Sequence, residues 1–181
     1  PALCSFMRQA QKSNRPMHLM GLVSDGGVHS HLNHLKALCA RARSFELRDV
    51  DIHAVTDGRD CDPTSGLGHL QDLEQHLAST TGTISSVIGR YYAMDRDRRW
   101  ERTQKAYELM VHRKGRPFER IQELMNSSYE EGITDEFVEA AQRSIGGKPL
   151  PGIKNGDSVI CFKFRTDRGR KISEVRNKSA Q

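Results

Sequence analysis

The run Met17-His18-Leu19-Met20-Gly21-Leu22-Val23 is compact and largely apolar, and Ser24-Asp25-Gly26-Gly27 follows it directly. An apolar run of this length that ends at a glycine turn is typical of a buried strand. A helical pattern begins near His29, with apolar side chains at Leu32, Leu35, Leu38 and Cys39. The stretch therefore predicts a strand, a turn and a helix start. This arrangement points backbone N–H groups and the positive end of the helix at a ligand.

The same unit occurs twice more along the chain. Residues 50–55 are predicted to form a second strand, which ends in Thr56-Asp57-Gly58-Arg59-Asp60 and precedes leucines at helical spacing from Leu67 to Leu77. Residues 83–88 form a third run, and a helix is expected from about residue 99 to residue 112. Strands that alternate with helices predict an α/β fold of three layers, α/β/α, with a mostly parallel central sheet. Ligands bind such sheets at the carboxyl ends of the strands.

The pattern is less regular in the rest of the chain. Helices are expected at residues 3–13 and 117–129, and a strand at residues 158–164 is expected to lead into a last helix after Arg170. Residues 137–145 fit a strand or a helix equally well. No linker or change of composition divides the sequence, which predicts a single domain over residues 1–181.

Composition limits the possible functions. The 181 residues include 28 basic and 23 acidic side chains, a net charge of +5 that suits an anionic ligand but does not by itself indicate nucleic acid. The four cysteines show no CxxC pairing and are expected to be free thiols in a reducing compartment. No run approaches the roughly 18 apolar residues of a membrane span, and the opening Pro1-Ala2-Leu3 lacks the shape of a signal peptide. We therefore expect a cytoplasmic protein without a membrane partner. Because the first residue is not methionine, we also expect a piece of a longer chain.

Residues 89–102 are rich in arginine and directly follow the third apolar run. They read Gly-Arg-Tyr-Tyr-Ala-Met-Asp-Arg-Asp-Arg-Arg-Trp-Glu-Arg and contain five arginines, three acids and three aromatic residues. Arginine offers a planar fork of donors that binds phosphate or carboxylate at two points. The stretch alone fits an anion-binding loop or a charged helix start with internal ion pairs equally well.

Three further loops favour the anion-binding interpretation. Residues 24–31, 57–60 and 165–168 each place arginine, aspartate or histidine directly after a predicted strand. Because the carboxyl ends of parallel strands meet at one edge of a sheet, these loops and residues 89–96 are expected to converge. Together they predict a pocket for a doubly or triply charged anion.

These motifs closely resemble those of the cofactor-independent phosphoglycerate mutases. The resemblance runs in order over essentially the whole chain, through residues 21–31, 57–60, 89–102, 132–137 and 164–170. It implies a protein of two domains, of which this chain is the phosphotransferase, or substrate-binding, domain. By this resemblance, the metal-dependent domain, related to alkaline phosphatase, is expected to lie outside this chain. That domain would carry the serine nucleophile and two divalent metal ions, usually manganese, so no cofactor is expected in this chain.

The resemblance also implies an activity and a set of site residues. The whole enzyme would interconvert 3-phosphoglycerate and 2-phosphoglycerate in glycolysis and glucose catabolism, with the phosphate held on the serine while the glycerate reorients. Asp60 would exchange a proton with a glycerate hydroxyl, and pairs of arginines would hold the carboxylate. The substrate-binding positions implied are His29, Arg59, Asp60, Arg90, Arg96, Arg165 and Arg168.

Other interpretations are weighed against this one. Asp25, His29 and His31 could bind a metal ion, but two histidines spaced by two residues at a helix start do not share a face, and anion binding is preferred. A stand-alone anion-binding or regulatory module would use the same residues. A nucleic-acid binder would need a basic stripe with interleaved aromatics. Here acids stand beside the arginines, so no nucleic-acid partner is expected.

Overall fold

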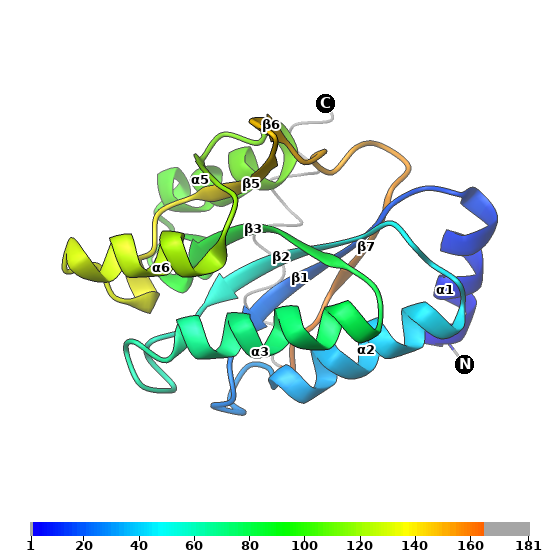
Figure 1. Cartoon of the computed structure of the whole chain (residues 1–181), viewed down its shortest axis with the longest axis horizontal. Helices are drawn as coiled ribbons and strands as arrows, with labels where there is room; N and C mark the ends of the chain where they lie inside the picture. The colour runs from blue at the N-terminus through cyan, green and yellow to red at the C-terminus, as the bar shows by residue number, and fades with distance from the viewer. Residues whose placement is uncertain (1, 165–181) are drawn as a thin grey trace.

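The central sheet is mixed and mostly parallel. A computed structural model describes residues 2–164, and the sheet has the strand order β4-β5-β3-β2-β1-β7, with β6 paired to β5 (Figure 1). The strands are β1 (Met17–Val23), β2 (Val50–Thr56), β3 (Thr83–Gly89), β4 (Arg116–Phe118), β5 (Ala141–Ile145), β6 (Lys148–Pro149) and β7 (Ser158–Cys161). The neighbours β3, β2, β1 and β7 run parallel, whereas β5 is antiparallel to β3.

Helices cover both faces of this sheet, which confirms the predicted α/β fold. They are α1 (Ala2–Ser13), α2 (Leu32–Ser44), α3 (Gly66–Ser79), α4 (Arg90–Ala93), α5 (Trp100–His112) and α6 (Ile121–Glu130), with one 3₁₀ turn, η1 (Asp135–Phe137). Figure 1 shows α2 and α3 side by side across the front of β1, β2 and β3. Two separate apolar clusters, one on each face, make the arrangement three-layered.

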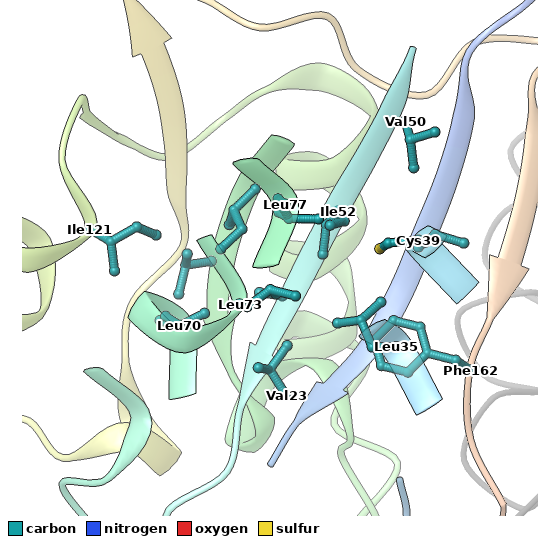
Figure 2. Close-up of a cluster of buried hydrophobic side chains, with 14 of the residues drawn as sticks. Val23, Leu35, Cys39, Val50, Ile52, Leu70, Leu73, Leu77, Ile121 and Phe162 are labelled. Carbon is teal, nitrogen blue, oxygen red and sulfur yellow. The ribbon is translucent and has the colours of Figure 1, made fainter. Parts of the chain in front are cut away.

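The larger cluster lies between the sheet and helices α1, α2, α3 and α6. In α3, Leu70, Leu73 and Leu77 follow the helical period and point at Ile52 of β2 (Figure 2). Leu70, Leu73 and Ile52 have no exposed surface. Burial of one such side chain contributes about 1.5–3 kcal/mol. The leucine spacing that predicted α3 is therefore the pattern that packs it on the sheet.

The smaller cluster covers the opposite face with α4 and α5. Met20, Val55 and Ile88 come from β1, β2 and β3, and they pack against Leu109 and Met110 of α5. In β1 and β2, odd- and even-numbered residues contribute to different clusters, because successive side chains of a strand point to opposite faces. Burial on both faces explains why apolar side chains of these strands point to both sides of the sheet.

The register of the three central strands aligns their carboxyl ends. Val23 pairs with Thr56, and Thr56 pairs with Gly89. The loops that follow β1, β2 and β3 therefore leave the sheet at the same level. This alignment is what allows side chains from three distant parts of the sequence to meet.

Several predicted boundaries were wrong. The helix expected near His29 begins at Leu32, with His31 as its N-cap, because the Ser30 hydroxyl donates to the Leu22 carbonyl and holds residues 28–31 in a turn. The helix expected over residues 117–129 begins at Ile121, since Arg116–Phe118 pairs with β5 instead. The last described strand ends at Cys161 rather than residue 164. The expected final helix lies outside the described residues.

Residues 135–145 resolve the ambiguous segment. They form η1 and then β5, so the strand interpretation holds only for the second half. The one-turn helix α4, directly after β3, was not predicted. Within residues 2–164, the helices are too short or too polar to cross a lipid bilayer.

Candidate anion-binding site

Arg90 lies at the centre of the three aligned strand ends. It is the first residue of α4, directly after β3, and its side chain is 2% exposed. Its Nη1 donates to Asp57 Oδ1 at 2.5 Å and to Asp60 Oδ2 at 2.7 Å, and both acceptors belong to the loop after β2. The Asp57 carboxyl is 1% exposed and that of Asp60 is 19% exposed. A buried guanidinium thus joins the ends of two strands.

Asp57 organises its own loop as well as Arg90. Its Oδ1 accepts hydrogen bonds from the backbone N–H groups of Arg59, at 3.2 Å, and Asp60, at 3.0 Å. Burial acts to raise the pKa of Asp57, but the Ser24 hydroxyl, the Asp60 N–H and the Arg90 guanidinium outweigh it and lower that pKa. Burial likewise opposes the charge of Arg90, yet the two carboxylates raise its pKa. Both partners therefore stay ionised.

The loop after β1 supplies the third wall. His29 is 2% exposed, and its Nε2 lies 3.7 Å from Asp60 Oδ2. Gly26 packs so closely that an added Cβ would lie 2.7 Å from the Asp60 carbonyl oxygen, and the Gly26 N–H donates to the Ser24 hydroxyl. The Phe164 N–H donates to the His29 carbonyl at 2.7 Å, so the chain after β7 also reaches this edge.

Arg59 forms an ion pair with a residue of η1 that the sequence did not predict as its partner. Its side chain is 51% exposed, and its Nη1 lies 3.5 Å from Glu136 Oε1 in η1. Two bonds fix η1 against the strand ends: the Thr56 hydroxyl donates to the Asp135 carbonyl, and the Gly89 N–H donates to the Val138 carbonyl. Sequence reasoning missed Glu136 because it lies 77 positions after Arg59, and only the resemblance of residues 132–137 pointed to this segment at all.

The arginine-rich stretch contains internal ion pairs, and its anion-binding function stays a prediction. Arg90 is buried in the site, whereas Arg102 forms ion pairs with Asp95 at 3.3 Å and Asp97 at 3.7 Å and lies 3.8 Å over the Tyr91 ring. Arg96 is exposed in the loop between α4 and α5. Trp100, the first residue of α5, is 44% exposed.

The geometry favours an anionic ligand. Arg90 Nη2 is buried and finds no hydrogen-bond acceptor among residues 2–164. A buried guanidinium N–H without an acceptor costs about 1–3 kcal/mol or more, since its water is lost and not replaced. A phosphate or carboxylate oxygen at this position would satisfy the donor. Asp60 and His29 stand beside it, where they could exchange a proton with a bound hydroxyl.

Comparison with known proteins agrees with this geometry. The family described as "BPG-independent PGAM N-terminus (iPGM_N)" matches residues 1–180. The chain belongs to this family. Two curated relatives are named 2,3-bisphosphoglycerate-independent phosphoglycerate mutase. The protein from Parabacteroides distasonis is 48% identical over 92% of the chain, and that from Moorella thermoacetica is 49% identical over 96%.

A solved structure of a Leishmania mexicana phosphoglycerate mutase, crystallised at low cobalt concentration, has the same fold with a TM-score of 0.84. It is 28% identical to this chain, and the match covers 95% of this chain and 37% of the Leishmania chain. The chain spans 33% and 34% of the two curated relatives, about a third of their length. The predicted family membership is confirmed.

The structure places the residues implied by the family resemblance in three groups. His29, Asp60 and Arg90 meet within one cluster, with Asp57 beneath them. Arg59 and Arg96 are exposed, and Arg59 lies in the same loop as Asp60. Arg165 and Arg168 lie outside the described residues. For all seven residues, the role in substrate binding stays a prediction.

Asp25, His29 and His31, which the sequence offered as an alternative metal site, form no shared group of metal-ligating atoms within the described residues. His29 Nε2 lies 3.7 Å from Asp60, and His31 caps α2 by accepting from the Asn33 N–H. Asp25 instead faces His69 of α3, with 3.3 Å between Oδ1 and Nε2. A sequence pattern could not have identified this pair, since the two residues lie in separate strand-turn-helix units.

Proposed function

We propose that this chain is the substrate-binding part of a phosphoglycerate mutase that interconverts 3-phosphoglycerate and 2-phosphoglycerate, a step of glycolysis carried out in the cytoplasm. The observation that carries the proposal is the buried Nη2 of Arg90, which needs an acceptor at the meeting point of three strand ends. Membership of the BPG-independent family supports the choice of phosphoglycerate as the anion.

The buried and the exposed arginines are proposed to bind the ligand in different ways. Arg90 is fixed by Asp57 and Asp60, so it can receive an anion without losing side-chain entropy at that moment. Arg59 and Arg96 are exposed and can close over the ligand. A charge-assisted hydrogen bond contributes about 1.5–3 kcal/mol. Several such bonds are needed to retain glycerate after its phosphate has left.

Asp60 is the proposed proton-transfer group. Its carboxyl is partly exposed, accepts from Arg90 and lies within 3.7 Å of His29 Nε2. A carboxylate in this position can remove a proton from a glycerate hydroxyl and later return it. His29 can donate a hydrogen bond to a phosphate oxygen from the other side.

The rest of the machinery is proposed to lie in the remaining two thirds of the protein. That part would hold the serine that carries the phosphate and two divalent metal ions, manganese by the family resemblance, which would supply Lewis-acid activation. The three grouped metal-ligating side chains in the described residues, Asp25, Cys61 and His69, do not fit a manganese pair. Manganese prefers carboxylate and water oxygens, and one thiol, one imidazole and one carboxylate are a different donor set.

Calorimetry with 3-phosphoglycerate tests the proposal on the 181-residue chain. Arg59→Ala and Arg96→Ala are each expected to weaken binding roughly 10- to 100-fold, the equivalent of one charge-assisted bond. Arg43→Ala is the matched control, since Arg43 is an exposed arginine in the last turn of α2, which leads to the opposite edge of the sheet. Equal affinities for all four proteins, or no binding at millimolar ligand, would overturn the proposal. Mutase turnover by this chain alone would contradict the placement of the serine elsewhere.

A further inference from the structure

Three metal-ligating side chains meet beside the strand ends, outside the arginine cluster. Asp25 comes from the loop after β1, Cys61 from the loop after β2, and His69 from the first turn of α3. One carboxylate oxygen, the Cys61 Sγ and one imidazole nitrogen all lie within 4.8 Å of one another. The phosphoglycerate chemistry proposed above uses none of them.

We propose that these three side chains form a zinc site. Zinc binds thiolate, imidazole and carboxylate ligands in a tetrahedron, at about 2.3 Å, 2.0–2.1 Å and 2.0–2.2 Å respectively, so its ligand atoms lie roughly 3.3–3.6 Å apart. Asp25 Oδ1 and His69 Nε2 are already 3.3 Å apart. Small rotations of the Asp25 and Cys61 side chains complete the three-ligand set. The fourth position is left to water.

The three ligands differ in how firmly they are held: His69 lies in the first turn of α3, Cys61 is tied to the same turn, and Asp25 is the most exposed. His69 has a side chain that is 15% exposed, and its backbone N–H donates to the Ser65 carbonyl in the first turn of α3. Ser65 also donates from its hydroxyl to the Cys61 Sγ at 3.3 Å, which ties Cys61 to the same turn. The Asp25 carboxyl is 62% exposed. This exposed carboxylate can therefore turn toward the Cys61 thiol and the His69 imidazole.

The surroundings favour a positive ion at this position. The buried carboxyl of Asp135 lies within electrostatic range of His69. Burial raises the pKa of Asp135, and the Tyr129 hydroxyl, the Gly66 N–H and the nearby His69 imidazole only partly oppose this rise. The Asp135 carboxylate also accepts from the Gly66 N–H at 2.7 Å and from the Tyr129 hydroxyl, so it is fixed behind α3. A negative group behind a metal-bound histidine stabilises the charge that the ion introduces.

The donor set selects the metal. A thiolate is a soft ligand, which favours zinc over magnesium, calcium or manganese. Zinc displaces a thiol proton on binding, so zinc affinity is expected to rise with pH. Cys61 directly follows Asp60. Zinc would therefore link the loop after β1 to the loop that carries the proposed proton-transfer group.

Cobalt spectroscopy and zinc competition test the site on the 181-residue chain. Co²⁺ replaces zinc in such sites and reports thiolate bonding by a near-ultraviolet charge-transfer band and tetrahedral geometry by visible bands. We expect one equivalent of Co²⁺ to produce both sets of bands and one equivalent of Zn²⁺ to remove them. A chromophoric chelator then gives the zinc affinity by competition, without any assay of enzyme activity.

Variants decide whether these three residues are the ligands. Cys61→Ser should abolish the charge-transfer band, and His69→Gln and Asp25→Asn should weaken zinc binding by at least about 10- to 100-fold, the loss that even an outer partner of a metal site produces. Cys161→Ser and His34→Gln are the controls, because these are an exposed cysteine and an exposed histidine outside the group. Co²⁺ bands that survive Cys61→Ser, or zinc affinity that changes equally in the control variants, would overturn the proposal.

Discussion

The buried pair of Arg90 and Asp57 provides the sharpest test of how the site is built. The two side chains are 2% and 1% exposed and 2.5 Å apart. In Arg90→Met, the Asp57 carboxylate stays buried without its cation, a change that destabilises proteins by about 3–5 kcal/mol. Asp57 keeps hydrogen bonds from the N–H groups of Arg59 and Asp60. We therefore expect a loss near 3 kcal/mol, the lower end of that range.

A double-mutant cycle isolates the pair. In Asp57→Asn, the Arg90 guanidinium loses one of its two carboxylate partners and keeps Asp60. The double variant Arg90→Met/Asp57→Asn removes both charges of the pair. Because contacting residues couple by about 0.5–3 kcal/mol, the double variant should lose less stability than the sum of the single losses. Lys36→Met is the matched control. Lys36 and Asp72 are 2.6 Å apart but 21% and 53% exposed, and an exposed pair contributes no more than about 1 kcal/mol.

Urea denaturation followed by far-ultraviolet circular dichroism measures these losses. The lowered pKa of Asp57 means that the stabilisation is present at neutral pH and disappears as the pH falls through the folded-state pKa. In Arg90→Met the carboxyl has lost its cation, its pKa rises, and protonation relieves the penalty. The deficit should therefore shrink between pH 7 and pH 5. Strictly additive losses, or a deficit independent of pH, would refute the account of a desolvated ion pair.

Three further predictions concern other parts of the fold. Burial raises the pKa of Asp51 to about 6 from 3.8, so its ionisation in the folded state opposes folding above that pH by up to about 3 kcal/mol. Asp51→Asn should therefore stabilise the chain more at pH 8 than at pH 5 in urea titrations. Gly89→Ala should destabilise by about 3 kcal/mol or more, because the added Cβ would lie 2.2 Å from the Glu136 carbonyl oxygen. Gly68→Ala, which meets nothing within 4 Å in α3, should instead raise the melting temperature slightly, through about 0.5–1 kcal/mol of helix propensity. Glu136→Gln should weaken 3-phosphoglycerate binding less than Arg59→Ala does, since it loosens Arg59 without removing it.

Each prediction has an outcome that contradicts it. A stability difference for Asp51→Asn that does not change with pH would mean that the carboxyl is not desolvated. Equal melting temperatures for Gly89→Ala and Gly68→Ala would mean that η1 does not pack on the end of β3. Calorimetry that shows the same affinity for Glu136→Gln and the unaltered chain would remove Glu136 from the positioning of Arg59.

Much of the fold followed from local patterns. The boundaries of β1 matched the apolar run at residues 17–23, and the leucines of α3 predicted both the helix and its buried face. These elements depend on burial periodicity, which is written directly in the order of residues. Boundaries failed where a distant contact competed with local preference: Arg116–Phe118 joined β5 as a strand, although the surrounding pattern suggested a helix.

The candidate site was predictable only in outline. Parallel strands must end at a common edge, so the convergence of the loops after β1, β2 and β3 followed from the strand-helix rhythm. Which arginine became buried did not follow. Arg90 and Arg96 looked equivalent in sequence, yet Arg90 is enclosed by Asp57 and Asp60, whereas Arg96 is exposed.

The sequence by itself determined the class of fold and the family, because both depend on residue types and on their order along the chain. Tertiary structure alone decided which side chains meet. Glu136 reaches Arg59, and His69 reaches Asp25, only because strand order and register carry separate segments to one edge of the sheet. Local sequence does not encode the register between distant strands, because that register results from packing both faces of the whole sheet at once.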